Sequence, residues 1–216
     1  MEIIKYQKKN HKQIIKACVQ ALKQGRVVAY PTDTSYGLAV DAGNTKAIKK
    51  LYQIKQRENT RPVHVIVPSA AYAKKIVRWD GLASKLVKKF WPGALTIILP
   101  LKSRLLTLKQ LSAGTGFLGI RMPDNETALD LSRVLKMPIT TTSANPPSGM
   151  AGDDSYSADD VVRQFAGKKY KPDIVINAGA LPKRKPSTMV KIEDGRISVL
   201  RQGPISEKQI LKVLKK

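Results

Sequence analysis

Apolar residues recur along the chain with two spacings, one typical of helices and one typical of strands, and glycine or proline separates the segments. The clearest helical segment is 10–24, whose apolar positions lie three or four residues apart: Ile14, Ile15, Cys18, Val19 and Leu22. Gly25 follows as a stop signal. The same reasoning predicts further helices over 45–54, two segments within 70–90, 126–135, 158–165, and a last one opening at the capping box Ser206-Glu-Lys-Gln209.

Short apolar runs between these helices predict strands at 26–30, 63–67, 95–99, 118–122, 138–142 and 173–176. Two further runs, 188–192 and 197–200, flank Asp194-Gly195, a dipeptide typical of a two-residue hairpin turn. This alternation, with its antiparallel hairpin, indicates an α/β domain with a mixed β-sheet flanked by helices. The Gly-, Asp- and Ser-rich segment 148–157 predicts a mobile loop.

Composition is that of an ordinary globular chain. Its 216 residues suit one domain with its own core, and 42% of them are apolar. No run approaches the roughly 18 apolar residues of a membrane span, and the N-terminus lacks the pattern of a signal peptide. Because Cys18 is the only cysteine, an internal disulfide and a cysteine-based zinc cluster are excluded, and two histidines are too few for a histidine-rich metal site. We therefore expect a cytoplasmic protein without a structural metal.

The net charge is unusual. The chain has 39 Lys and Arg against 16 Asp and Glu, a formal charge of +23 that is spread along its length. Such a charge attracts polyanions and makes their binding dependent on salt. A solvated lysine-rich surface explains it equally well, so charge alone leaves both interpretations open.

Three segments carry chemistry. Tyr30-Pro-Thr-Asp-Thr-Ser-Tyr-Gly37 follows a predicted strand and offers many hydroxyls, which suits a small polar ligand or simply a turn held by its own side chains. Lys55, Arg57 and Arg61 place three cations close together, as a polyphosphate clamp requires. The helix dipole accounts for cations at that helix end as well.

The third segment is Thr140-Thr-Thr-Ser-Ala-Asn145, where Ser143 and Asn145 lie two apart and can address one ligand. No histidine or acid stands close in sequence to activate Ser143, so we expect binding and not covalent catalysis. Gly114-Thr-Gly116-Phe-Leu-Gly119 precedes a strand, which disfavours a dinucleotide site, and no P-loop motif occurs.

Seven blocks resemble the YrdC family in order and spacing, from about residue 11 to 203. They are Tyr30-Pro-Thr-Asp-Thr-Ser-Tyr-Gly-Leu38, Lys55-x-Arg57, Phe90-Trp-Pro-Gly-Ala-Leu-Thr96, Gly119-Ile-Arg-Met-Pro123, Thr142-Ser-Ala-Asn145, Pro186-Ser-Thr188 and Leu200-Arg-Gln-Gly203. The resemblance implies a single-domain threonylcarbamoyl-AMP synthase over 1–216, with a concave basic groove and no additional C-terminal domain. Such enzymes combine L-threonine, bicarbonate or CO₂ and ATP, with Mg²⁺ accompanying ATP, and release pyrophosphate. A downstream transferase then modifies the adenosine next to the anticodon of tRNAs that read ANN codons.

The resemblance also implies residue roles. The set expected at threonine is Thr34, Arg121, Thr141 and Ser187. The set expected at ATP is Arg57, Arg61, Ser143 and Arg201, and the catalytic set facing the phosphates is Lys55, Arg57, Ser143 and Asn145. Charge on the phosphates would be stabilised electrostatically, Arg121 would hold the threonine carboxylate, and the loop 148–157 would enclose the site.

This sequence departs from the family pattern in places. Members often carry asparagine or lysine at Arg61, and some have a histidine at Ile66, whereas here His64 lies two residues earlier on the same strand face. One extra residue follows Asn145, which affects the assignments near 151–152.

Two other functions remain open from the sequence. One is a non-catalytic module that binds double-stranded RNA or tRNA, which the charge of +23 fits but which does not require the polar set around Ser143. The other is a carbamoyl-transfer domain of the hydrogenase-maturation type, which the length and single cysteine disfavour.

Overall fold

The computed structural model describes residues 1–56, 61–147 and 154–214. Its ten strands form one mixed sheet in the order β1-β8-β2-β3-β7-β4-β6-β5-β9-β10. The strands are β1 (Glu2–Lys5), β2 (Val28–Tyr30), β3 (Gly37–Ala39), β4 (His64–Ile66), β5 (Leu95–Pro100), β6 (Phe117–Arg121), β7 (Ile139–Ser143), β8 (Ile174–Asn177), β9 (Thr188–Glu193) and β10 (Arg196–Arg201).

Helices cover this sheet and connect its strands. They are a short 3-10 turn (Lys8–Asn10), α1 (His11–Lys23), α2 (Thr45–Lys55), α3 (Ala70–Ile76), α4 (Gly81–Phe90), α5 (Leu106–Leu111), α6 (Glu126–Leu135), α7 (Ala158–Gln164) and α8 (Glu207–Leu214). None of those helices is both long and apolar enough to cross a membrane. The predicted mixed sheet flanked by helices is confirmed, whereas the predicted basic groove stays a prediction.

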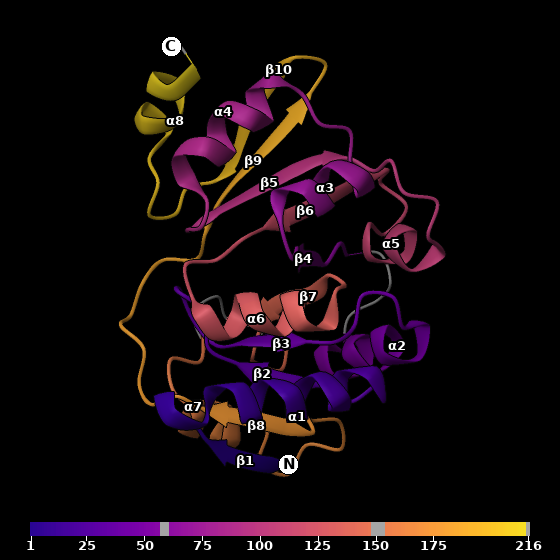
Figure 1. The fold of residues 1–216 in the computed structure, drawn as a ribbon, viewed down its shortest axis with the longest axis vertical. Coiled ribbons are helices and arrows are strands. Elements are labelled where there is room, and N and C mark those ends of the chain that lie inside the picture. The colour runs from indigo at the N-terminus through magenta and orange to yellow at the C-terminus, as the bar shows by residue number, and fades with distance from the viewer. Residues whose placement is uncertain (57–60, 148–153, 215–216) are drawn as a thin grey trace.

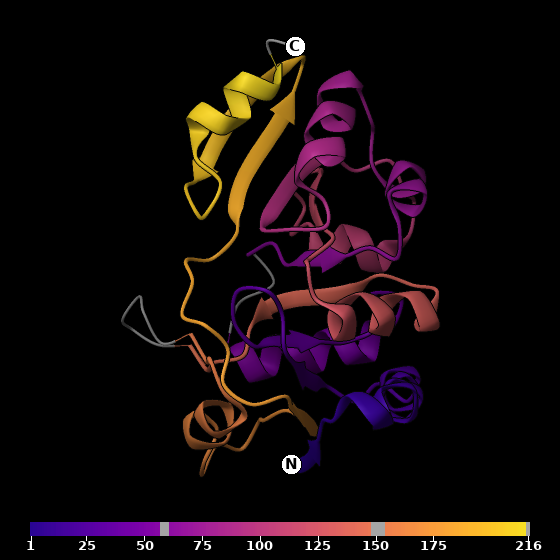
Figure 2. The same cartoon turned by 60° about the vertical axis from the view of Figure 1, so that its left-hand side comes forward.

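The strands β7 and β4 join two halves of the molecule (Figure 1). One half holds β1, β8, β2, β3 and β7 with α1, α2, α6 and α7, and the other holds β4, β6, β5, β9 and β10 with α3, α4, α5 and α8. The connection 178–187 runs along the outside from β8 in the first half to β9 in the second (Figure 2). Residues far apart in sequence therefore meet near the middle of the sheet.

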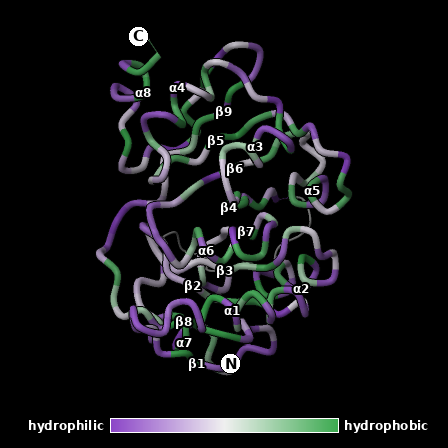
Figure 3. Tube along the Cα trace, viewed as in Figure 1, coloured by the Kyte–Doolittle hydropathy of each residue, from purple (hydrophilic) through white to green (hydrophobic). Residues whose placement is uncertain are grey.

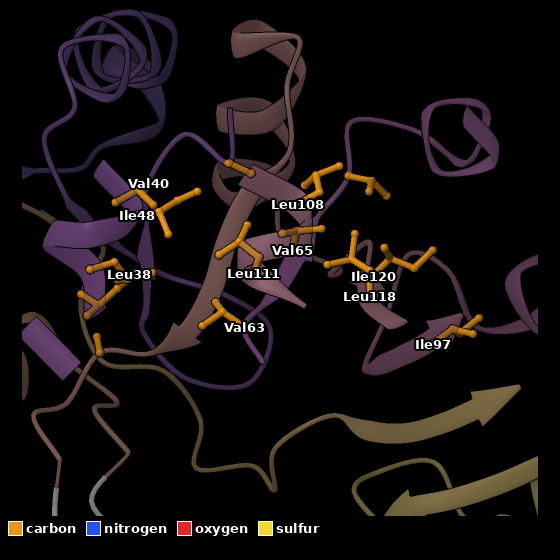
Figure 4. Packing of buried hydrophobic residues seen from close by; sticks show 14 of the residues in the cluster. Leu38, Val40, Ile48, Val63, Val65, Ile97, Leu108, Leu111, Leu118 and Ile120 are labelled. Atoms are coloured by element: carbon orange, nitrogen blue, oxygen red, sulfur yellow. The ribbon is translucent and has the colours of Figure 1, made fainter. Parts of the chain in front are cut away.

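Both faces of the sheet are buried, because helices pack on each side. Along the second strand, Ala29 faces one apolar core and its neighbours Val28 and Tyr30 face the other, as the two-residue period of a strand requires. Figure 4 shows the larger core, where Leu38, Val65 and other strand residues pack together with helix residues. Apolar stretches follow the strands, and hydrophilic ones are common in the outer connections (Figure 3).

The predicted elements are confirmed within one or two residues at each end. Asp194 and Gly195 have φ angles of 48° and 71°, as a tight hairpin turn requires. The Ser206 and Gln209 pair also forms its capping box, because the backbone N–H of each bonds the other's side chain. Four short elements were not predicted: β1, β3, α5 and the 3-10 turn are only four, three, six and three residues long.

Gly119 on β6 accommodates a side chain from the neighbouring strand. A Cβ atom built there would lie 2.3 Å from Cδ2 of His64, whose ring therefore covers this glycine. We expect Gly119→Ala to lower the free energy of unfolding by about 1–3 kcal/mol, because either the ring or the strand must move. Chemical denaturation of the variant measures this loss.

The matched control is the same substitution in a His64→Ala background. There the added methyl group meets no ring, and most of the lost stability should return. An equal loss in both backgrounds would show that the ring of His64 is not the cause.

Candidate functional site

A polar cavity of about 190 Å³ opens where the two halves of the sheet meet. Its walls come from the β2–β3 loop, the start of β4, the strands β5, β6 and β7, and the segments around 154, 186–187 and 201. The lining residues are Thr32, Thr34, Ser35, Tyr36, Gly37, Pro62, Val63, His64, Thr96, Arg121, Thr141, Thr142, Ser143, Asp154, Pro186, Ser187 and Arg201. Hydroxyl groups and two arginines dominate this lining, so the cavity suits a small, polar, anionic ligand.

The β2–β3 loop is built by its own hydroxyl groups. The Oγ1 of Thr32 accepts hydrogen bonds from the backbone N–H groups of Thr34 and Ser35, and it lies 2.7 Å from the carbonyl oxygen of Ser35. The two interpretations of this segment, a turn held by its own side chains and a site for a small polar ligand, are therefore compatible, because the turn also lines the cavity.

Arg121 at the end of β6 is held in a buried ion pair. Its Nη2 lies 2.5 Å from Oδ1 of Asp33, and the two side chains are 5% and 6% exposed. The Nε donates to the carbonyl oxygen of Gly93, and Nη1 lies 3.4 Å from Oγ1 of Thr34. Burial lowers the pKa of Arg121, and the Asp33 charge opposes that shift. Three of five N–H donors make these bonds, which leaves donors for a ligand carboxylate.

Arg201 and Ser187 form a second polar group in the cavity lining. The Nε of Arg201 donates to the carbonyl oxygen of Ser187 at 3.0 Å, and its Nη2 lies 3.2 Å from the Ser187 hydroxyl. That hydroxyl is also 2.9 Å from Oγ1 of Thr96 on β5. Because β5 and β9 pair in parallel, the connection before β9 is held beside this strand, and Ser187 is buried.

Lys55, the last residue of α2, is buried with only 2% of its surface exposed. Its Nζ donates to the carbonyl oxygens of Ser143 and Asn145 at 3.0 and 2.5 Å, and to Oδ1 of Asn145 at 2.7 Å. The Ser143 hydroxyl donates to the same Oδ1 at 2.6 Å. The lysine thus fixes the chain that leaves β7, and Ser143 bonds an amide rather than a base.

The structure brings most of the predicted site residues to one place. Six line the cavity: Thr34, Arg121, Thr141, Ser143, Ser187 and Arg201. Lys55 and Asn145 bond each other behind the cavity wall. Arg61 is exposed and directly precedes the lining residue Pro62. Arg57 lies outside the described residues, as do positions 148–153 of the predicted mobile loop. The extra residue that follows Asn145 belongs to the described pair Pro146 and Pro147, which is neither helix nor strand.

Sequence reasoning missed three residues of the site. Asp33 is half of the buried ion pair, and Asp154 lines the cavity, yet neither was singled out. His64 was noted without a role, and its ring lies in the cavity wall, whereas Ile66 is fully buried in the core. Asp33 could have been found from the sequence as the acid between Thr32 and Thr34, because a buried arginine needs a nearby anion.

Comparisons with known proteins show the family to which this chain is similar. A family model named Sua5_yciO_yrdC and described as telomere recombination matches residues 20–203. A Methanocaldococcus jannaschii protein with the provisional name threonylcarbamoyl-AMP synthase is 35% identical, over 95% of this chain and 93% of its own. The threonylcarbamoyl-AMP synthase of Bacillus subtilis is also 35% identical, over 95% of this chain but 57% of its own.

A solved structure resembles this fold closely. Pyrococcus abyssi Sua5 complexed with L-threonine superposes with a TM-score of 0.86 and 28% identity, covering 99% of this chain and 60% of that one. The chain therefore matches one relative over nearly its full length and spans about three fifths of the two longer ones.

Proposed function

The chain belongs to the Sua5/YciO/YrdC family, and we propose that it is a threonylcarbamoyl-AMP synthase. The reaction condenses L-threonine, bicarbonate or CO₂, and ATP to threonylcarbamoyl-AMP and pyrophosphate. One observation carries the proposal: hydroxyls and arginines from six separated segments converge on one cavity without an activated nucleophile among the described residues. Such a cavity binds and orients two substrates so that they react directly with each other.

The threonine end of the cavity is proposed at Arg121. Its remaining N–H donors would hold the substrate carboxylate in a fork, while the Asp33 pair keeps the guanidinium in place. The hydroxyls of Thr34, Thr141 and Ser187 would bond the substrate's polar groups. The threonine amine then attacks bicarbonate, which gives a carbamate and one water molecule.

The ATP end is proposed around Ser143 and Arg201. A carbamate oxygen attacks the α-phosphorus of ATP, the bond to the β-phosphate breaks, and pyrophosphate leaves with its electron pair. Negative charge grows on the phosphate oxygens, where Arg201 and the sequence-assigned Arg57 and Arg61 would stabilise it. Lys55 would act by holding Ser143 and Asn145 in position. Bound Mg²⁺ would neutralise part of the phosphate charge, and one lining residue is a carboxylate of suitable chemistry.

The wider assignment is also a proposal. The labile product would pass to a transferase that modifies tRNA, and this chemistry would take place in the cytoplasm. A purely RNA-binding role is not favoured, because its relatives carry the name of the synthase and electrostatic RNA binding needs no enclosed hydroxyl cavity.

We expect the purified protein to release pyrophosphate from ATP when threonine and bicarbonate are both present. A coupled phosphate assay measures the release, and reactions without threonine or without bicarbonate are the controls. Mass spectrometry of the quenched reaction should find threonylcarbamoyl-AMP. A pyrophosphate signal independent of threonine, or none at all, would contradict the proposed function.

A further inference from the structure

We propose that Asp154 is the residue through which the protein itself binds the divalent cation that accompanies ATP, a role that rests on the proposed function. Asp154 is the one acidic residue among those that line the cavity within the described part of the chain. It lies in the segment before Ser157, the N-cap of α7, and lines the cavity together with Arg201 and Ser143.

The position of Asp154 is fixed by its neighbour in the chain. Ser155 is fully buried, its hydroxyl donates to the carbonyl oxygen of Ala144 at 2.7 Å, and its own carbonyl accepts from the N–H of Tyr36 at 2.8 Å. The N–H of Ala144 in turn donates to the carbonyl of Tyr36. This closed set of bonds holds Ser155 against Ala144, the residue after Ser143, and so fixes the backbone next to Asp154 beside the end of β7.

Two cations influence Asp154: Arg201, which also lines the cavity, and Lys55, which does not. Burial raises the pKa of its carboxyl, and the nearby positive charges of Arg201 and Lys55 oppose that rise. Arg201 responds in the same way, since the Asp154 charge raises its pKa against the lowering effect of burial. Nevertheless, no described cation lies within 4 Å of the carboxylate. The carboxylate therefore lies near these two cations without forming an ion pair among the described residues.

A carboxylate in this position needs an explanation. A bare triphosphate is strongly anionic, so an acid beside its binding cations weakens ATP binding by repulsion. The same acid becomes favourable when a divalent cation lies between it and the phosphates. Mg²⁺ is commonly bound in this way, by one or two carboxylates together with substrate phosphates and water. The cavity supplies one such carboxylate, and nearby cations such as Arg201 can neutralise the phosphate charge that Mg²⁺ leaves.

The test measures binding without turnover. Calorimetry with α,β-methylene-ATP, which cannot release pyrophosphate, gives the affinity with Mg²⁺ and with EDTA, for wild type and for Asp154→Asn. Mn²⁺, followed by its paramagnetic resonance spectrum, reports the cation directly in the complex with the same nucleotide. Asp159→Asn is the matched control, because Asp159 is an exposed acid five residues later on α7. Asp154→Glu keeps the charge.

We expect Mg²⁺ to raise the wild-type affinity for the analogue and Asp154→Asn to reduce that gain by about ten-fold or more. Loss of a residue that only supports a metal ligand already costs about ten-fold in metal affinity, and loss of the ligand itself should cost more. With EDTA, Asp154→Asn should bind the analogue at least as tightly as wild type. Asp159→Asn should match wild type, and Asp154→Glu should recover part of the gain. Melting temperatures confirm that each variant folds.

An unchanged Mg²⁺ gain in Asp154→Asn would overturn the inference, and so would an unchanged Mn²⁺ spectrum. If synthesis were also lost in that variant, Asp154 would instead serve the threonine amine. Wild-type protein that binds no analogue with or without Mg²⁺ would contradict the proposed function itself, which separates the two failures.

Discussion

Arg121→Ala is expected to lower kcat/KM for threonine-dependent pyrophosphate release by about 100-fold or more. Two charge-assisted hydrogen bonds to the threonine carboxylate are lost, and each contributes about 1.5–3 kcal/mol. The free energy of unfolding should also fall, by about 3–5 kcal/mol, because Asp33 is left as an unpaired charge in a site where its side chain is 6% exposed. Steady-state kinetics and urea denaturation measure the two effects.

Arg121→Lys separates binding from folding. It keeps a positive charge beside Asp33 but loses the planar fork, so most stability should remain while KM for threonine rises. Arg133→Ala is the control for stability, because Arg133 is 48% exposed, pairs with Asp130 on the surface, and should lose no more than about 1 kcal/mol. An Arg121→Ala protein with normal KM for threonine would refute the assignment of the threonine end.

Lys55→Met is expected to abolish detectable synthesis and to reduce stability by about 3 kcal/mol without ATP present. The ammonium group lies among three oxygens of Ser143 and Asn145, and removing it leaves buried acceptors without their donor, at about 1–3 kcal/mol for each unsatisfied group. The chain after β7 should then shift, taking the Ser143 hydroxyl with it. Urea denaturation without nucleotide and the pyrophosphate assay measure the two losses.

The stability measurement distinguishes two roles for Lys55. A lysine that only contacts phosphate would leave the nucleotide-free protein as stable as wild type. A lysine that positions the wall lowers stability before ATP is added. Lys50→Met on the same helix is the control, because Lys50 pairs with Asp173 where the two side chains are 37% and 25% exposed, so its loss should be no more than about 1 kcal/mol.

The sequence predicted the long elements well, because helical or strand-like spacing is a local property. The helix at 10–24, the capping box at Ser206 and the turn at Asp194 all follow from a few neighbouring residues. The short strand β3 could not be predicted in this way. It exists because β2 and β7 lie on either side of it and satisfy its backbone groups.

Family resemblance also located most of the candidate site in advance, since Thr34, Arg121, Thr141, Ser143, Ser187 and Arg201 do line one cavity. Each of the segments had a plausible local explanation, such as a turn or a helix end. Only their joint occurrence in order indicated one active site. Whether each residue contacts the assigned substrate stays a prediction.

What the sequence determined by itself is therefore the type and order of the long elements, the absence of an internal disulfide, and a set of polar segments that belong to one family. Tertiary structure alone decided how the polar groups pair. It placed Lys55 against the oxygens of Asn145, 90 residues away, and Arg121 against Asp33, 88 residues away. The physical reason is that a buried charge must find a partner, and chain folding, not sequence distance, determines which one lies within reach.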